Sequence, residues 1–148
     1  MIQEECSVLS KKAKSTALVL LNNATRQRCQ QGFGAQLSRL AQNDPSYLTS
    51  PAYREVYTAL CRDVALDVRR ALAFKSPSHA RVMERLVAHP EQLYHESILE
   101  ENGIYTYPLL FGLLYFSLTR RTPKTEDLQI VQQYFTKFLC EIAEGHPS

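Results

Sequence analysis

The chain has 148 residues, 45% hydrophobic and 22% charged, with a formal net charge of +2. These values match ordinary globular domains and exclude a disordered or fibrous chain, and the charge is too small for a dedicated nucleic-acid binder. A chain of this length buries enough surface to fold without staples, so residues 1–148 are predicted to form a single helical domain.

The first quarter of the sequence carries apolar residues at helical spacing. Over residues 2–24 the apolar side chains recur three or four positions apart, which predicts an amphipathic helix. The pattern resumes between Cys29 and Leu40, where glycines at positions 32 and 34 weaken it. Either a second helix begins near Gly34 or one long helix bends there.

Prolines mark the predicted starts of the next three helices. Ser50 offers a capping hydroxyl before Pro51, and the apolar spacing that follows predicts a helix to about Phe74. Ser76-Pro77 and His89-Pro90 repeat the signal and predict short helices near 77–88 and 90–102, the second ending at Gly103.

The segment 108–120 has almost no polar face and must therefore be surrounded by protein. Periodicity cannot separate a buried helix from a buried strand here, so strands within 104–119 are the alternative. We favour a helix because its neighbours are helical. A last helix is predicted to be capped at Thr125 and to run up to Gly145.

These elements together predict a compact all-α bundle of six to seven helices with a central apolar helix near 108–120. The alternative is an α+β fold with strands in 104–119. The four cysteines are scattered without metal-site spacing, which predicts separate thiols and a reducing, cytoplasmic location. The longest apolar stretch is shorter than the ~20 residues that a membrane span needs, so no membrane partner is expected.

The sequence contains no phosphate-binding loop, nucleotide-binding glycine motif, serine-hydrolase motif or zinc-protease motif. The nearest approach to a ligand cluster combines Glu91, His95, Glu96 and Glu100. A di-metal site in a helical bundle needs a matching motif on a second helix, and none is present. We therefore predict no catalytic residue, metal ligand or cofactor, and a protein that is not an enzyme.

Two surface features point to partners. One is a basic patch around the predicted turn at residue 75, formed by Arg69, Arg70, Lys75, Arg81 and Arg85. These cations either form solvated faces or bind an acidic partner or a phosphate backbone. The other feature is Ile130 and Tyr134, which lie off the main apolar stripe of the last helix and predict a second apolar flank that serves as an interface.

The first of three hypotheses is a non-enzymatic helical module for protein–protein interaction, of a regulatory, adaptor or chaperone-like kind, that binds another protein or itself as a homodimer. The second is a nucleic-acid-binding regulator that uses the basic 69–85 region. Within it, single-strand binding is disfavoured because aromatic residues do not interleave with these arginines. The third is a sensor of a small apolar ligand with a pocket beside Tyr107 to Phe116.

Overall fold

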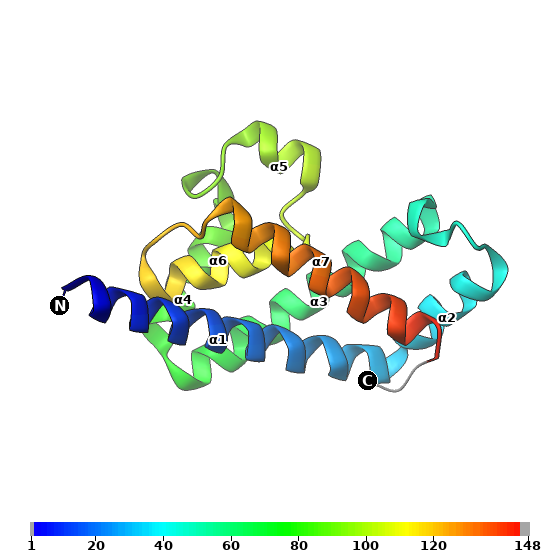
Figure 1. Cartoon of the computed structure of the whole chain (residues 1–148), viewed down its shortest axis with the longest axis horizontal. Helices are drawn as coiled ribbons and strands as arrows, with labels where there is room; N and C mark the ends of the chain where they lie inside the picture. The colour runs from blue at the N-terminus through cyan, green and yellow to red at the C-terminus, as the bar shows by residue number, and fades with distance from the viewer. Residues whose placement is uncertain (1, 146–148) are drawn as a thin grey trace.

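A computed structural model describes residues 2–145, with side chains from position 11 onward, and shows an all-α fold (Figure 1). The α-helices are α1 (Ile2–Arg28), α2 (Gly34–Asn43), α3 (Pro51–Lys75), α4 (Pro77–Ala88), α5 (Glu96–Asn102), α6 (Tyr107–Thr119) and α7 (Thr125–Ala143). Short helical turns are η1 (Cys29–Phe33), η2 (Tyr47–Thr49) and η3 (Pro90–Gln92). The predicted helical bundle is confirmed.

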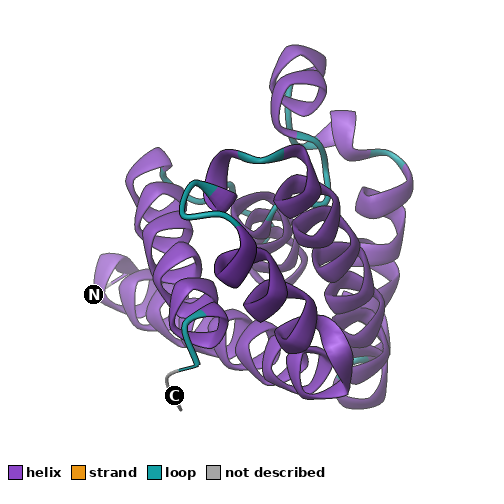
Figure 2. Ribbon diagram, turned by 90° about the vertical axis from the view of Figure 1, so that its right-hand side faces the viewer, coloured by secondary structure: helices purple, strands orange, loops and turns teal. Residues whose placement is uncertain are grey.

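Helix α6 is the core of the bundle. It packs against α1, α3, α4 and α7, and residues Leu109 to Tyr115 are all buried. Figure 2 shows helices joined by loops, and no residue from 2 to 145 belongs to a strand. The alternative of strands in 104–119 is therefore wrong. The chain is extended at Thr106 and Pro108 lies in the first helical turn, where its missing N–H costs no hydrogen bond.

A glycine separates α1 from α2. Gly32 has φ +149°, a backbone conformation that L side chains rarely adopt, and it interrupts the helical path inside η1. The chain thus bends at Gly32 and α2 begins at Gly34. Both parts of the predicted alternative, the bend and the new helix, are present.

The predicted helix over 90–102 is wrong, because two short elements replace it. Residues 93–95 are not helical: the side chain of Tyr94 turns inward and is buried. His95 then caps α5, its Nδ1 accepting a hydrogen bond from the Ser97 N–H at 3.2 Å. Gly103 ends α5 with φ +74°, as predicted.

The two helix ends on either side of Pro123 also differ slightly from prediction. Arg120 takes a left-handed conformation with φ +62°, so α6 ends at Thr119. Thr125 is already helical, and the extended residue before it is Lys124, whose side chain makes no capping hydrogen bond. The predicted cap at Thr125 is therefore wrong by one position.

Three described cysteines, Cys29, Cys61 and Cys140, are free thiols. Cys61 is enclosed in the core, and burial raises its pKa above the usual value for a thiol. None of the helices within residues 2–145 combines the length and the apolar character that a membrane crossing requires.

Candidate functional site

Large apolar side chains stay exposed at six described positions, which form two groups. They are Val19, Leu48, Phe74, Ile98, Ile130 and Tyr134. Leu48 and Ile98 line a groove, whereas the other four lie elsewhere. Ile130 and Tyr134, the predicted interface residues, are 63% and 44% exposed, and Val19 and Phe74 are 51% and 93% exposed. Sequence periodicity does not single out Val19 or Phe74.

Contacts between α1 and α7 fix how these helices are aligned. The two run in the same direction in Figure 1. Lys14 Nζ lies 3.0 Å from Asp127 Oδ2, and Asn22 Nδ2 donates a hydrogen bond of 3.4 Å to Tyr134 Oη. A helical residue on α1 therefore lies level with the residue about 112 positions later on α7. This places Val19 level with about Val131, the residue next to Ile130.

Helix α3 runs antiparallel to α1, as Figure 1 shows, and one arginine fixes their alignment. Arg28 donates to Asp67 through Nε at 2.6 Å and through Nη2 at 2.8 Å, and its Nη1 lies 3.6 Å from Asp63 Oδ2. Val19 is nine residues before Arg28, and Phe74 is nine residues beyond the midpoint of the two aspartates. Because the rise per residue is the same in both helices, Val19 and Phe74 lie at the same level.

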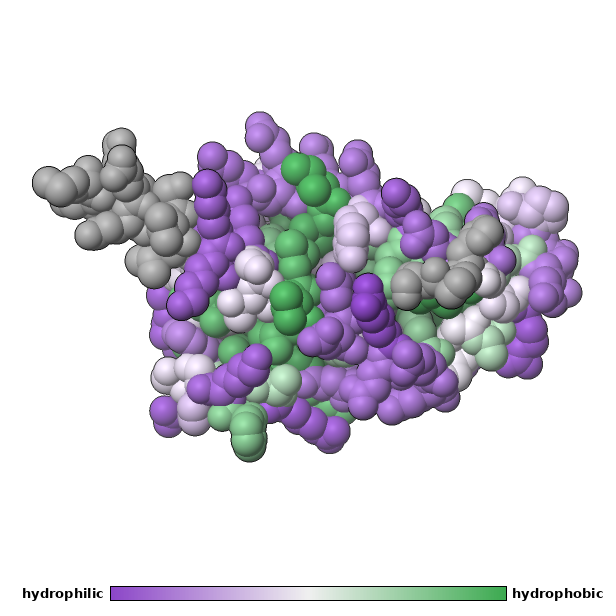
Figure 3. Space-filling view, turned by 60° about the horizontal axis from the view of Figure 1, so that its bottom comes forward, coloured by the Kyte–Doolittle hydropathy of each residue, from purple (hydrophilic) through white to green (hydrophobic). Residues whose placement is uncertain are grey.

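Val19, Phe74, Ile130 and Tyr134 are thus exposed apolar residues at about the same level of α1, α3 and α7, and we call them the apolar stripe. Figure 3 views the face on which α1 lies and shows apolar surface crossing it, with hydrophilic side chains on both sides. An exposed apolar row with a polar border is typical of an interaction surface.

One side of the stripe is cationic. Residues four or seven positions apart share a helix face, so Arg26, Arg70 and Lys137 lie on the same faces as Val19, Phe74 and Ile130 respectively. By the alignment above, all three lie towards the C-terminal ends of α1 and α7. They are exposed, and none forms an ion pair with a described residue, although Arg26 lies 5.9 Å from the Phe138 ring centroid. We call these three residues the cationic flank.

The opposite side of the stripe carries mixed charge. Lys12 lies one heptad before Val19, and Glu126 lies one turn before Ile130. Both are exposed. The face therefore has one edge with three cations and one edge of mixed charge, which also includes exposed Lys75 beside Phe74.

The predicted basic patch lies on the hairpin of α3 and α4. Arg70, Lys75, Arg81 and Arg85 are exposed, and Arg69 is half-buried. None of the five forms an ion pair with a residue in the described part of the chain. Arg70 also belongs to the cationic flank, so the patch adjoins the apolar stripe.

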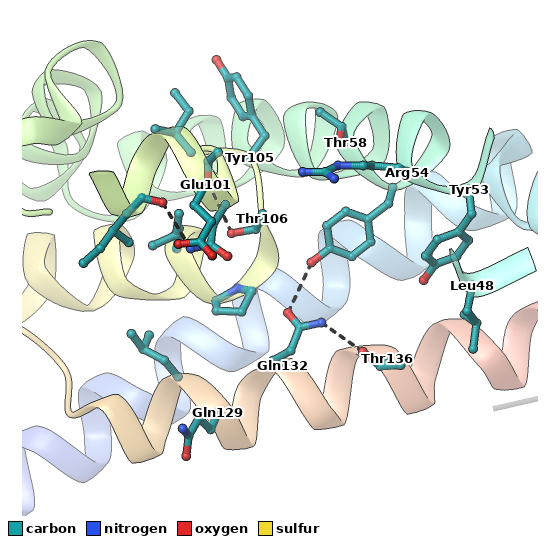
Figure 4. A pocket seen from close by; sticks show the side chains of 18 of the residues that line it. Leu48, Tyr53, Arg54, Thr58, Glu101, Tyr105, Thr106, Gln129, Gln132 and Thr136 are labelled. Carbon is teal, nitrogen blue, oxygen red and sulfur yellow. Dashed lines mark hydrogen bonds between the residues drawn. The ribbon is translucent and has the colours of Figure 1, made fainter. Parts of the chain in front are cut away.

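A second candidate surface is the groove between the first half of α3, the α5–α6 connection and α7, with a volume of about 1400 Å³ (Figure 4). Gln132 joins its walls: Tyr57 Oη donates to Gln132 Oε1 at 3.5 Å, and Gln132 Nε2 donates to Thr136 Oγ1 at 3.1 Å. Burial raises the pKa of Tyr57 above its usual value, so its hydroxyl stays protonated at neutral pH. The groove is lined by hydrogen-bonding groups and by the aromatic residues Tyr53, Tyr57 and Tyr105.

The groove reaches only one end of the predicted small-ligand pocket. Thr106, Pro108 and Leu109 line it, whereas Leu110, Phe111 and Leu114 are packed in the core. The volume also exceeds the roughly 300–1,000 Å³ of typical small-ligand sites.

The acidic residues around His95, which are the nearest approach to a ligand cluster in the sequence, are on the surface. Glu91, Glu96 and Glu100 are exposed, and His95 serves as the α5 cap. His89 Nδ1 lies 3.4 Å from a Glu91 carboxylate oxygen. Within residues 11–145 no group of three or more His, Cys, Asp or Glu side chains is placed to hold a metal ion.

Comparison with known proteins gives no relative. No protein family, curated protein or solved structure matches this chain.

Proposed function

We propose that this protein is a non-enzymatic helical interaction module that binds another protein through its apolar stripe. The observation that carries the proposal is the alignment of Val19, Phe74 and Ile130 at one level on three different helices. Covering one such side chain contributes about 1.5–3 kcal/mol, so a partner that covers the row gains several independent contributions.

The buried tyrosine and cysteine side chains support a passive, structural role for these groups. The described tyrosines and cysteines with displaced pKa values are displaced upward, chiefly by burial, which keeps them neutral. A nucleophile or general base needs a pKa near the working pH or an activating neighbour. Binding is thus the function that the surface supports best, and a reducing compartment such as the cytoplasm suits the free thiols.

Site-specific photo-crosslinking in the native cell tests this proposal. A photoreactive phenylalanine analogue is placed at Val19, at Ile130 or, as the matched control, at Leu48, which is also apolar and exposed but lines the groove. We expect one protein to be crosslinked from positions 19 and 130 and not from 48. Purified, that protein should bind the wild-type chain and lose binding to the Ile130→Asp variant.

Two results would overturn the proposal. The first is that no protein is crosslinked from both stripe positions, and the second is that the common product binds Ile130→Asp as well as it binds the wild type. Crosslinking of the chain to itself from both positions would instead identify the homodimer and overturn a heterologous partner.

Nucleic-acid binding through the 69–85 region is the second candidate, because five cations there lack an ion-pair partner among the described residues. It predicts a duplex or single-strand mobility shift that disappears steeply as salt rises. The control is Arg54→Glu, which removes an exposed arginine outside the patch. No shift at low salt, or an equal loss in Arg54→Glu and Arg81→Glu, would exclude this candidate.

A further inference from the structure

We infer that the partner segment that covers the apolar stripe is an amphipathic α-helix with acidic residues along one edge of its apolar face. This inference rests on the proposed function, and it adds the chemistry of the partner. Three observations carry it: the length of the stripe, its narrowness and the charge of one edge.

The length of the stripe suits a short helix. Packed helices lie about 8–10 Å apart, and α1 packs directly on α3 but less closely on α7, so the row from Phe74 on α3 through Val19 on α1 to Ile130 on α7 spans at least about 16–20 Å. A helix with a rise of 1.5 Å per residue covers this distance with about 11 to 13 residues. Its apolar side chains, three and four positions apart, form a single row of the same kind.

The charges beside the stripe then indicate which residues the partner helix carries along one edge. A helix lying along the stripe presents one edge to Arg26, Arg70 and Lys137 and the other to the region of Lys12 and Glu126. Carboxylates on the first edge meet three cations that have no ion pair with a described residue. Lysines on that edge would meet like charges, which costs affinity.

The same charges argue against the other occupants. A second copy of this chain placed on the stripe brings a second cationic flank to the face. The repulsion between like charges disfavours this dimer unless the two cationic flanks lie apart. A nucleic-acid backbone supplies phosphates but no apolar surface for Val19 and Ile130. A membrane would favour a broad apolar surface, whereas here the exposed apolar side chains form one row with charged residues beside it.

Peptide binding measured by fluorescence anisotropy tests the inference on the intact chain. The probes are labelled amphipathic helices of about 13 residues with leucine on one face and with glutamate, lysine or glutamine along one edge. We expect the glutamate peptide to bind more tightly than the glutamine peptide, and the lysine peptide to bind most weakly. Added salt should reduce this difference.

Variants locate the binding. Phe74→Asp and Ile130→Asp should weaken binding of the glutamate peptide by at least about tenfold, whereas the matched Leu48→Asp should leave it unchanged. Arg70→Glu and Lys137→Glu should weaken the glutamate peptide and strengthen the lysine peptide, and Arg54→Glu should change neither. Circular dichroism and thermal unfolding show that each variant is folded.

Several outcomes would overturn the inference. One is equal binding of the three peptides or no binding of the glutamate peptide, and another is binding that Leu48→Asp reduces as much as Ile130→Asp. Vesicles of phosphatidylserine and phosphatidylcholine that bind only with Phe74 intact, without peptide binding, would identify a membrane instead. If crosslinking from positions 19 and 130 still finds a common partner, only the chemistry of the partner is wrong. If both experiments fail, the proposed function fails too.

Discussion

The hydroxyl group of Tyr94 occupies the space into which a side chain at position 112 would project. A Cβ atom at Gly112 would overlap the Tyr94 hydroxyl oxygen and lie 2.9 Å from the Tyr94 Cζ. Gly112 is in the middle of α6, and Tyr94 belongs to the break between η3 and α5. The connection to α5 can therefore pack against the core because position 112 has no side chain.

The Gly112→Ala variant tests this relationship. Alanine is a better helix former than glycine by about 1 kcal/mol, yet we expect the variant to lose about 1–3 kcal/mol of unfolding free energy because Tyr94 must move. Adding Tyr94→Phe should recover part of the loss, since the overlapping oxygen is removed. Urea unfolding of the four members of the cycle measures the coupling. Additive effects of the two substitutions would contradict this packing of Tyr94 against Gly112.

Alkaline pH should destabilise the protein through its buried tyrosines. Burial raises the pKa of Tyr47 and of Tyr94 from 10.0 to about 12. Between these values the unfolded chain releases protons that the folded chain keeps, so the free energy of unfolding falls as pH rises. The stabilisation is fully present below pH 10 and is lost as pH rises through about 12.

Urea unfolding at a series of pH values up to about 11.5 measures how steeply the free energy of unfolding falls with pH. Tyr94→Phe should have a shallower slope than the wild type. It should also be as stable as the wild type at neutral pH or slightly more stable, because the Tyr94 hydroxyl is buried without a hydrogen-bond partner in the described structure. An unchanged slope in Tyr94→Phe would show that Tyr94 titrates at its ordinary pKa.

The helices that could be predicted from the sequence are those with local start signals. Ser50 accepts a hydrogen bond from the Tyr53 N–H at 3.1 Å, and Pro51 follows it directly, so the start of α3 depends on neighbouring residues alone. The burial of α6 could also be predicted from its own residues, because they are almost all apolar and leave no polar face. The interruption of the helix between η3 and α5 could not be predicted from neighbouring residues. It depends on Tyr94 packing against Gly112, which is distant in sequence.

The apolar stripe shows the same limit. Ile130 could be found because it lies outside the main apolar face of its own helix. Val19 lies beside a regular apolar pattern and Phe74 lies two residues after the last buried residue of another, Leu72, so neither stood out. Their exposure depends on the alignment of α1 with α3 and α7, which is fixed by pairs such as Arg28–Asp67 and Asn22–Tyr134. Sequence periodicity identifies the faces of one helix but not the level at which helices meet.

The Arg28–Asp67 pair should stabilise the contact between α1 and α3. Its two hydrogen bonds, of 2.6 and 2.8 Å, match the planar guanidinium to the carboxylate, and the hydrogen bond to Asp67 raises the pKa of Arg28. Lysine keeps the charge but cannot form this paired geometry. We expect Arg28→Lys to lose about 1–2 kcal/mol of unfolding free energy, measured by urea unfolding. The control Arg26→Lys should be nearly neutral, and equal effects at the two positions would contradict a specific role for the pair.

Two phenylalanines of opposite exposure give the last prediction. Phe135 is buried and stacks on Tyr107 with ring centroids 3.8 Å apart, whereas Phe74 is 93% exposed. Phe135→Ala should lose about 3–5 kcal/mol of unfolding free energy, because it removes core contacts and leaves a cavity. Phe74→Ala should change it by less than about 0.5 kcal/mol, because its ring is already in water. Thermal or urea unfolding compares the two. A large loss in Phe74→Ala would mean that Phe74 is packed inside the folded chain, and the apolar stripe would then lose its member on α3.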